Sequence, residues 1–132
     1  MQLNYSENTF RSKCSISCAL ELLGDKWTLL IIRDSLLLKL TSFNDFRSSP
    51  EKIASNILSD RLEKLVRNGI MTKTKNESNK LKYDYVLTKM GLELEPIVMT
   101  LANWGHKNIA GTNNAIDEAT IFINKQIKQK SS

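Results

Sequence analysis

The spacing of apolar residues changes twice along this chain, and this change constrains the fold more than any other feature. From residue 16 to residue 68 the apolar residues recur three or four positions apart, as they do on the buried face of a helix. Within 70–75 and 81–87 apolar and polar residues alternate, which is typical of half-buried strands, and residues 76–79 have turn composition. The helical spacing then returns. We therefore predict a mainly α fold that carries one small antiparallel hairpin.

Two helices begin the predicted fold. The first extends from Ile16 to Leu23 and ends at Gly24, a residue type that favours helix ends. Asp25 is a suitable N-cap for the second, which runs from Lys26 to about Leu38 and is apolar nearly all round. We expect this second helix at the centre of the core.

A short helix and a longer polar-faced helix follow. Thr41 and Ser42 offer caps for the short helix, which includes Arg47 and is broken by a Ser-Ser-Pro sequence. We predict that Ser55 is the N-cap of the longer helix and that Gly69 ends it after residue 68.

Two further helices are predicted after the hairpin. Thr88 caps a long helix that Pro96 kinks, because proline removes one backbone hydrogen bond. Its inward-facing residues are expected to be Leu94, Ile97, Val98, Leu101 and Trp104. A last helix near 114–128 carries an apolar stripe formed by Ile116, Ala119, Ile123 and Ile127.

This order of elements is the winged helix-turn-helix plan, in which the second helix of the motif enters the major groove of DNA and the hairpin lies along the backbone. Short polar side chains at the N-terminal end of that helix can contact base edges. Ser55, Asn56 and Ser59 occupy this end. The alternative is that they are simply solvated positions on an amphipathic helix.

The predicted hairpin is rich in lysine, and the chain as a whole is basic. The net charge is +5 and the pI is near 9.3, which favours a polyanionic partner. Four lysines of the hairpin could contact phosphates: Lys73, Lys75, Lys80 and Lys82. Lysines at hairpin edges also prevent pairing between sheets, so this pattern alone leaves both interpretations open.

Five stretches together resemble the HxlR-type family of bacterial transcriptional regulators, relatives of the MarR-like winged-helix proteins. They are CSISCALELLGDKWTLL at 14–30, SFNDFR at 42–47, SPEKIASNILSDRLEKLVRNGI at 49–70, YVLTKMG at 85–91, and LEP followed by NWG within 94–105. The match covers about 90 residues from Cys14 to Gly105. The resemblance implies a DNA-binding homodimer, with chain ends that pack across the subunit interface, which represses or activates nearby genes.

The family pattern also implies roles for individual residues. The recognition helix corresponds to 55–68, and Arg47 ends the first helix of the motif where the family often has a basic residue. Lys82 stands where the family often has an arginine in the wing, and a lysine cannot make the forked contact of a guanidinium. Ser15 and Asp25 replace the usual Pro and Gly, for which we expect local consequences.

Cys14 is a candidate redox or electrophile sensor. It lies at the predicted start of the first helix, where some members of the family carry a sensing cysteine, and a helix N-terminus favours the thiolate. Lys13 acts in the same direction. Cys14 and Cys18 could instead be small buried apolar residues, and we expect this of Cys18. A disulfide between the two within one helix would strain the backbone, so we expect a bridge to a second subunit or an adduct.

Catalysis is not expected. The chain has no Gly-rich phosphate loop, its single histidine, His106, has no metal-ligand cluster around it, and Cys14 lacks a general base. We therefore predict no cofactor or metal. A small-molecule effector that binds between the core and the dimer helices is conceivable but unidentified, and a winged-helix protein-interaction module without DNA binding is the alternative function.

The length and the apolar pattern favour a single cytoplasmic domain that spans residues 1–132, with dimerisation helices at both ends. No apolar run approaches the ~20 residues that a bilayer requires, and the N-terminus lacks the apolar core of a secretory signal. We expect a homodimer whose two recognition helices bind a pseudo-palindromic site in duplex DNA. We expect no association with a membrane.

Overall fold

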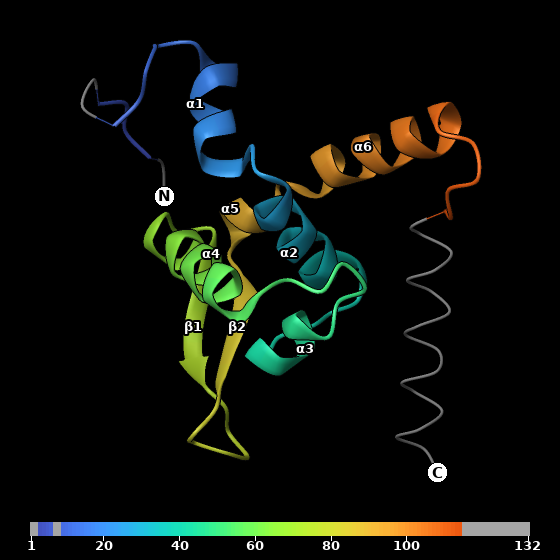
Figure 1. Cartoon of the computed structure of the whole chain (residues 1–132). Coiled ribbons are helices and arrows are strands. Elements are labelled where there is room, and N and C mark those ends of the chain that lie inside the picture. Colours follow the sequence, from blue (N-terminus) through green and yellow to red (C-terminus); the bar gives the residue numbers. More distant parts are fainter. Residues whose placement is uncertain (1–2, 7–8, 115–132) are drawn as a thin grey trace.

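The computed structural model of this chain describes residues 3–6 and 9–114. The predicted last helix, with Ile116, Ala119, Ile123 and Ile127, lies outside the described residues. The elements are α1 (Ser15–Leu23), α2 (Lys26–Leu37), α3 (Phe43–Arg47), α4 (Ser55–Arg67), β1 (Met71–Lys75), β2 (Tyr83–Leu87), α5 (Lys89–Leu92) and α6 (Glu95–Asn108). Figure 1 shows how these elements are arranged, with the hairpin of β1 and β2 between the helices that precede and follow it in the chain. The predicted winged helix-turn-helix fold is confirmed.

The core is built around α2, as expected. Ile32 in α2 is fully buried, and so are Leu58 and Leu62 on the inner face of α4. Phe46 of the short helix α3 is also buried and belongs to the same apolar core. No helix among the described residues is long and apolar enough to cross a lipid bilayer.

Short-range hydrogen bonds set the ends of the helices around the motif. The Asp25 side chain accepts a hydrogen bond from the Thr28 backbone N–H at 3.1 Å, and Ser42 accepts one from Asp45 in the same way, also at 3.1 Å. Gly69 ends α4 with a φ of 74°, a left-handed conformation that a glycine adopts without steric cost. The predicted caps at these three positions are confirmed.

The predicted cap at Ser55 is wrong by one residue. Ala54 is the N-cap of α4, with an extended backbone (φ −65°, ψ 142°), and Ser55 is already helical. The turn that precedes α4 brings the chain into helical geometry one residue earlier than the cap preference of serine suggested. The Ser55 hydroxyl is therefore not used to cap α4.

The long helix predicted after the hairpin is two helices. α5 ends at Leu92 and α6 begins at Glu95, so Pro96 lies in the first turn of α6, where its missing N–H removes no hydrogen bond. Val98 is buried, but Ile97 is 49%, Leu101 54% and Trp104 61% exposed, which contradicts the expectation that these three face inward. Figure 1 shows that α6 projects away from the other elements, so little of the domain is available to cover its outer half.

The hairpin is attached to the rest of the domain by a third extended segment. β1 and β2 pair antiparallel, with Met71 opposite Leu87 and Lys75 opposite Tyr83. The Tyr85 backbone N–H donates a hydrogen bond to the Thr41 carbonyl at 2.8 Å, just before α3. β2 begins at Tyr83 rather than at residue 81 as predicted, because the tip of the hairpin is longer. The wing is thereby held in a fixed position relative to α3 and α4.

Candidate nucleic-acid interface

The outer face of α4 is polar at its N-terminal end. Ser55, Asn56 and Ser59 are all exposed, whereas Leu58 and Leu62 between and below them are buried. Residues three and four apart lie on one face of a helix, so the three polar side chains form one patch. The structure brings these three predicted residues together.

Acidic side chains on α4 do not leave this surface strongly negative. The Asp60 carboxylate accepts a hydrogen bond from Arg61 Nη1 at 2.5 Å and lies 3.3 Å from Lys64 Nζ. The hydrogen bond from Arg61 lowers the pKa of Asp60, and Lys64 acts in the same direction. The negative charge nearest the middle of the helix is thus balanced by two cations of the same helix.

Arg47 ends α3 and is exposed. Within the described ranges its guanidinium forms no salt bridge. It is separated from the N-terminus of α4 by the turn of the motif, residues 48–54. The side chain is consequently free to contact a phosphate near the recognition helix.

The four lysines predicted for the wing fall into two groups. Lys73 lies over the aromatic ring of Tyr83, 4.3 Å from Nζ to the ring centroid, and 5.8 Å from that of Tyr85. Lys75, Lys80 and Lys82 are exposed, and no salt bridge holds any of them in the part of the chain that the structure describes. The charge of Lys73 is therefore partly satisfied within the wing, and the other three ammonium groups are available to a partner.

Asparagine side chains order the tip of the wing. Asn76 Oδ1 accepts hydrogen bonds from the backbone N–H groups of Ser78 and Asn79, both at 3.0 Å, and Asn79 Oδ1 accepts one from Leu81 at 3.1 Å. Asn76 Nδ2 also donates to Asp84 at 3.0 Å, which joins the tip to β2. The tip that carries Lys80 and Lys82 is a defined turn rather than a loose loop.

A charged cluster that the sequence analysis did not anticipate lies beside the turn of the motif. Arg33 projects from α2 and donates through Nη1 and Nη2 to the two carboxylate oxygens of Glu51, at 2.9 and 2.8 Å. The same Nη2 lies 3.1 Å from Ser49 Oγ and 2.7 Å from Asp34 Oδ1. An Arg-Asp pair within an otherwise apolar helix was the signal in the sequence that could have revealed it.

Burial and charge pairing shift the pKa values in this cluster in different directions. Hydrogen bonds from Arg33 lower the pKa of Glu51 to about 2. Burial raises the pKa of Asp34 above its usual range, and the adjacent Arg33 guanidinium offsets only part of that effect. Burial alone would lower the pKa of Arg33, but its two carboxylate partners outweigh this and raise it. Arg33 therefore stays charged and bound to Glu51.

A second ionic contact connects α4 to α2. Arg61 Nε lies 3.1 Å from Oδ1 of Asp25, the carboxylate that also caps α2. Burial raises the pKa of Asp25, but hydrogen bonds from Thr28 and Arg61 outweigh that effect and lower it overall. Asp25 thus contacts both helices.

Cys14 lies at the N-terminus of α1, as predicted, and the structure shows that it is exposed. It is the N-cap residue, and the backbone N–H groups of Ser17 and Ile16 lower the pKa of its thiol. Cys18 is half-buried rather than fully buried, and its thiol donates a hydrogen bond to the Ser12 carbonyl at 3.2 Å. Both thiols are free.

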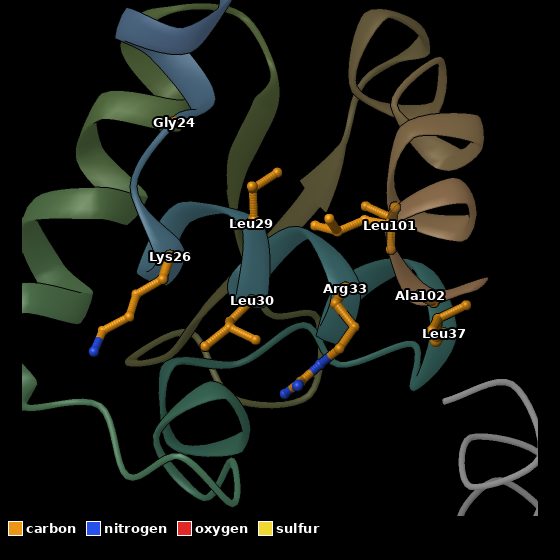
Figure 2. Close-up of a pocket in the computed structure, with 9 residues that line it drawn as sticks. Gly24, Lys26, Leu29, Leu30, Arg33, Leu37, Leu101 and Ala102 are labelled. Carbon is orange, nitrogen blue, oxygen red and sulfur yellow. The ribbon is translucent and has the colours of Figure 1, made fainter. Parts of the chain in front are cut away.

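An apolar groove of about 420 Å³ lies between α2 and α6. Figure 2 shows Leu29 and Leu101 on its two sides, with the charged ends of Lys26 and Arg33 directed away from Leu101. The full lining comprises Gly24, Lys26, Leu29, Leu30, Arg33, Leu37, Val98, Leu101 and Ala102. The groove therefore offers mainly hydrocarbon surface.

Known proteins resemble this chain in both sequence and fold. The model of the HxlR-like helix-turn-helix family matches residues 22–113. The HTH-type transcriptional regulator YdeP of Bacillus subtilis (strain 168) is 30% identical over 105 residues, which cover 80% of each chain. The structure of PA1607, described as a candidate transcription factor, has a TM-score of 0.70 and 33% identity and covers 78% of this chain and 70% of that one.

A redox regulator is also similar. The reduced form of HypR has a TM-score of 0.65 and 27% identity, and the match covers 74% of this chain and 95% of that one. The family match extends over α2, the complete helix-turn-helix motif and the wing. The chain therefore belongs to the HxlR-like helix-turn-helix family of transcriptional regulators.

Proposed function

We propose that this chain regulates transcription as a homodimer that binds a pseudo-palindromic operator in duplex DNA. The observation that carries the proposal is the exposed polar patch Ser55, Asn56 and Ser59 at the N-terminus of α4, next to an ordered wing whose tip carries Lys80 and Lys82. A helix of this kind fits the major groove, and a lysine-bearing hairpin fits the adjacent phosphates. Repression and activation are both compatible with this arrangement.

The proposed contacts divide into two kinds. Ser55, Asn56 and Ser59 contact base edges, where short polar side chains select among base pairs. Arg47 and the wing lysines Lys73, Lys75, Lys80 and Lys82 bind phosphates and supply affinity for any sequence. Among the lysines, Lys73 contributes least, because the rings of Tyr83 and Tyr85 already hold its ammonium group.

The proposed dimer would cover apolar side chains that a single chain exposes. Ile16 and Leu20 on α1 are 69% and 60% exposed, and Leu101 and Trp104 on α6 are exposed to a similar degree. Exposed apolar stripes on two elements are typical of a surface that meets another protein. We propose that residues 1–132 form one domain and that α1, α6 and the segment with Ile116, Ala119, Ile123 and Ile127 form the interface.

We further propose that the regulator acts in the cytoplasm and that Cys14 makes it responsive to oxidants or electrophiles. The thiol is exposed, its pKa is lowered by the N-terminus of α1, and α1 belongs to the proposed interface. A bridge or adduct at Cys14 would change the packing of α1 and so the spacing of the two α4 helices. The redox regulator HypR is a relative of similar fold, which supports this proposal.

The groove between α2 and α6 is the proposed place for an effector if the regulator has one. Its hydrocarbon lining suits a ligand with an apolar body, and its volume lies in the range of small-molecule sites. A ligand there would contact both the core of the domain and the helix that we assign to the dimer.

The experiment that tests the main proposal is selection from random DNA. Purified full-length protein would be incubated with a library of duplexes that share a randomised central segment, and bound molecules would be enriched and sequenced. We expect a two-fold symmetric consensus with half-sites about one helical turn apart. If no sequence were enriched and the protein bound DNA only at low salt, the result would contradict the proposal and favour a protein-interaction module.

A further inference from the structure

The turn of the helix-turn-helix motif is connected to the core in two different ways. Ile53 is buried among the apolar core residues, with 6% of its surface exposed. Ser49 and Glu51 lie on the other side of the same turn and bind Arg33 of α2. The residues of the turn deliver the chain to Ala54, the N-cap of α4. Any shift of the turn therefore moves the N-terminal end of α4.

These two connections restrict movement to different degrees. Apolar burial of Ile53 is non-directional, so the core holds the turn close without fixing its rotation. The contact between Arg33 and Glu51 joins two nitrogens to two oxygens, at 2.9 and 2.8 Å, and a planar fork of this kind tolerates little misalignment. The Ser49 hydroxyl adds a third hydrogen-bonded connection between the two side chains, since its Oγ donates to Glu51 at 2.9 Å and accepts from Arg33 at 3.1 Å.

The Arg33 side chain is itself held in place. Its Nε donates to Asp34 Oδ1 at 2.9 Å, and the Asp34 side chain is only 2% exposed. The side chain of Arg33 is 22% exposed. A buried carboxylate on the same helix thus orients the guanidinium toward the turn, and side-chain rotation is restricted at both ends of the contact.

The contact also balances charge near the proposed DNA surface. Glu51 is 36% exposed at its side chain, and a glutamate carboxyl is ionised at neutral pH with or without an arginine partner. An unpaired carboxylate beside the N-terminus of α4 would repel phosphates. Loss of Arg33 would therefore have two separable effects: a less defined position of α4 and an uncompensated negative charge.

We propose that Arg33 is a positioning residue for base recognition: by holding Ser49 and Glu51 against α2, it fixes the direction in which the N-terminus of α4 presents its polar side chains. This inference rests on the proposed function. The base-contacting patch contains no part of the cluster, so Arg33 acts through the turn rather than by touching DNA. Its loss should lower selectivity among sequences more than it lowers binding to DNA in general.

The experiment compares full-length Arg33→Ala, Arg33→Lys and Glu51→Gln with the wild type. The probes are the duplex that the wild type selects from the random library and a scrambled duplex of the same composition. Fluorescence anisotropy at several salt concentrations gives the ratio of the two affinities and the salt dependence of each. Leu87→Ala in β2 is the control, because it removes buried methyl groups from the core in a strand that belongs neither to the turn nor to the proposed dimer interface.

We expect Arg33→Ala to reduce the affinity ratio by about tenfold or more and Glu51→Gln to reduce it less, since glutamine can still accept one hydrogen bond. Arg33→Lys keeps the positive charge but cannot make the forked contact with Glu51. A wild-type salt dependence in this variant, together with an affinity ratio that is still below that of the wild type, would support a positioning role. Hydrogen exchange at residues 48–56 should be faster in Arg33→Ala and unchanged in Leu87→Ala. Glu51→Gln provides the test if Arg33→Ala does not fold.

Two outcomes would overturn the inference. A wild-type affinity ratio in folded Arg33→Ala or Glu51→Gln would assign the cluster to stability alone. Arg33→Ala could instead lose affinity equally for both duplexes and show an altered salt dependence, with both effects fully reversed in Arg33→Lys. That result would show that the cluster acts through its charge alone. A wild-type protein that binds the two duplexes equally would instead contradict the proposed function, so the two failures are distinguishable.

Discussion

Arg61 of α4 lies 3.1 Å from Asp25, from Nε to Oδ1, and Asp25 is the residue that caps α2. One carboxylate therefore stabilises the start of one helix and contacts the middle of another. The Arg33–Glu51 contact is another ionic connection, between α2 and the turn that precedes α4. Together they restrain the recognition helix near its start and along its length.

Substitution of Asp25 should separate its two roles. Asn is as good an N-cap as Asp, so Asp25→Asn loses only the ion pair with Arg61, whereas Asp25→Ala loses both interactions. We expect the free energy of unfolding to fall by roughly 1 to 2 kcal/mol in Asp25→Ala and by less than about 1 kcal/mol in Asp25→Asn. Urea denaturation followed by circular dichroism measures both. Equal losses in the two variants would show that the cap contributes little.

Acid should weaken the fold through Glu51. Its folded pKa of about 2 is below its usual value near 4.5, so its contribution to stability is complete above pH ~4.5 and is lost as the pH falls toward 2. Glu51→Gln lacks this contribution at every pH. We therefore expect the wild type to be more stable than Glu51→Gln at pH 6 and the difference to shrink between pH 4.5 and pH 2. A difference that is constant over this range would contradict the assigned pairing.

Substitutions on α4 and on the wing should affect DNA binding differently. Asn56→Ala and Ser59→Ala should lower discrimination between the selected and scrambled duplexes by roughly 1 to 3 kcal/mol. Lys80→Ala and Lys82→Ala should weaken binding to both duplexes and reduce the salt slope by about 1 each. If all four variants lost affinity equally for both duplexes, the placement of α4 as the recognition helix would be wrong.

The proposed dimer interface can be tested on α6. Trp104→Glu places a charge on the exposed apolar stripe, and Asn103→Glu places the same charge on a neighbouring exposed position outside that stripe. Sedimentation at micromolar concentration should show a dimer for the wild type and for Asn103→Glu and a monomer for Trp104→Glu. A wild-type monomer under these conditions would refute the dimer.

Oxidation should inhibit DNA binding through Cys14. Its pKa is lowered by the N-terminus of α1, which increases the reactive thiolate fraction at neutral pH. Diamide should therefore release the wild type and Cys18→Ser from DNA but not Cys14→Ser, as anisotropy would show. Retained affinity in wild type whose thiols have been consumed, or an identical response of Cys14→Ser, would exclude Cys14 as the sensor.

The sequence by itself determined the kinds of element, their order and most of their ends. Alternation and helical spacing separate strand from helix because the two structures repeat every 2 and 3.6 residues. Asp25, Ser42 and Gly69 mark helix ends through contacts within a few residues or through local backbone freedom. The recognition face of α4 followed from the same periodicity.

Only the tertiary structure decided which side chains meet and which faces are covered. Arg33 and Glu51 are 18 residues apart and Arg61 and Asp25 are 36 apart, so no local pattern links them. The exposure of Trp104 was likewise hidden, because periodicity identifies an apolar face but not whether another element packs on it. Partners distant in sequence come together only when the core has formed, and their contacts depend on the relative placement of whole helices.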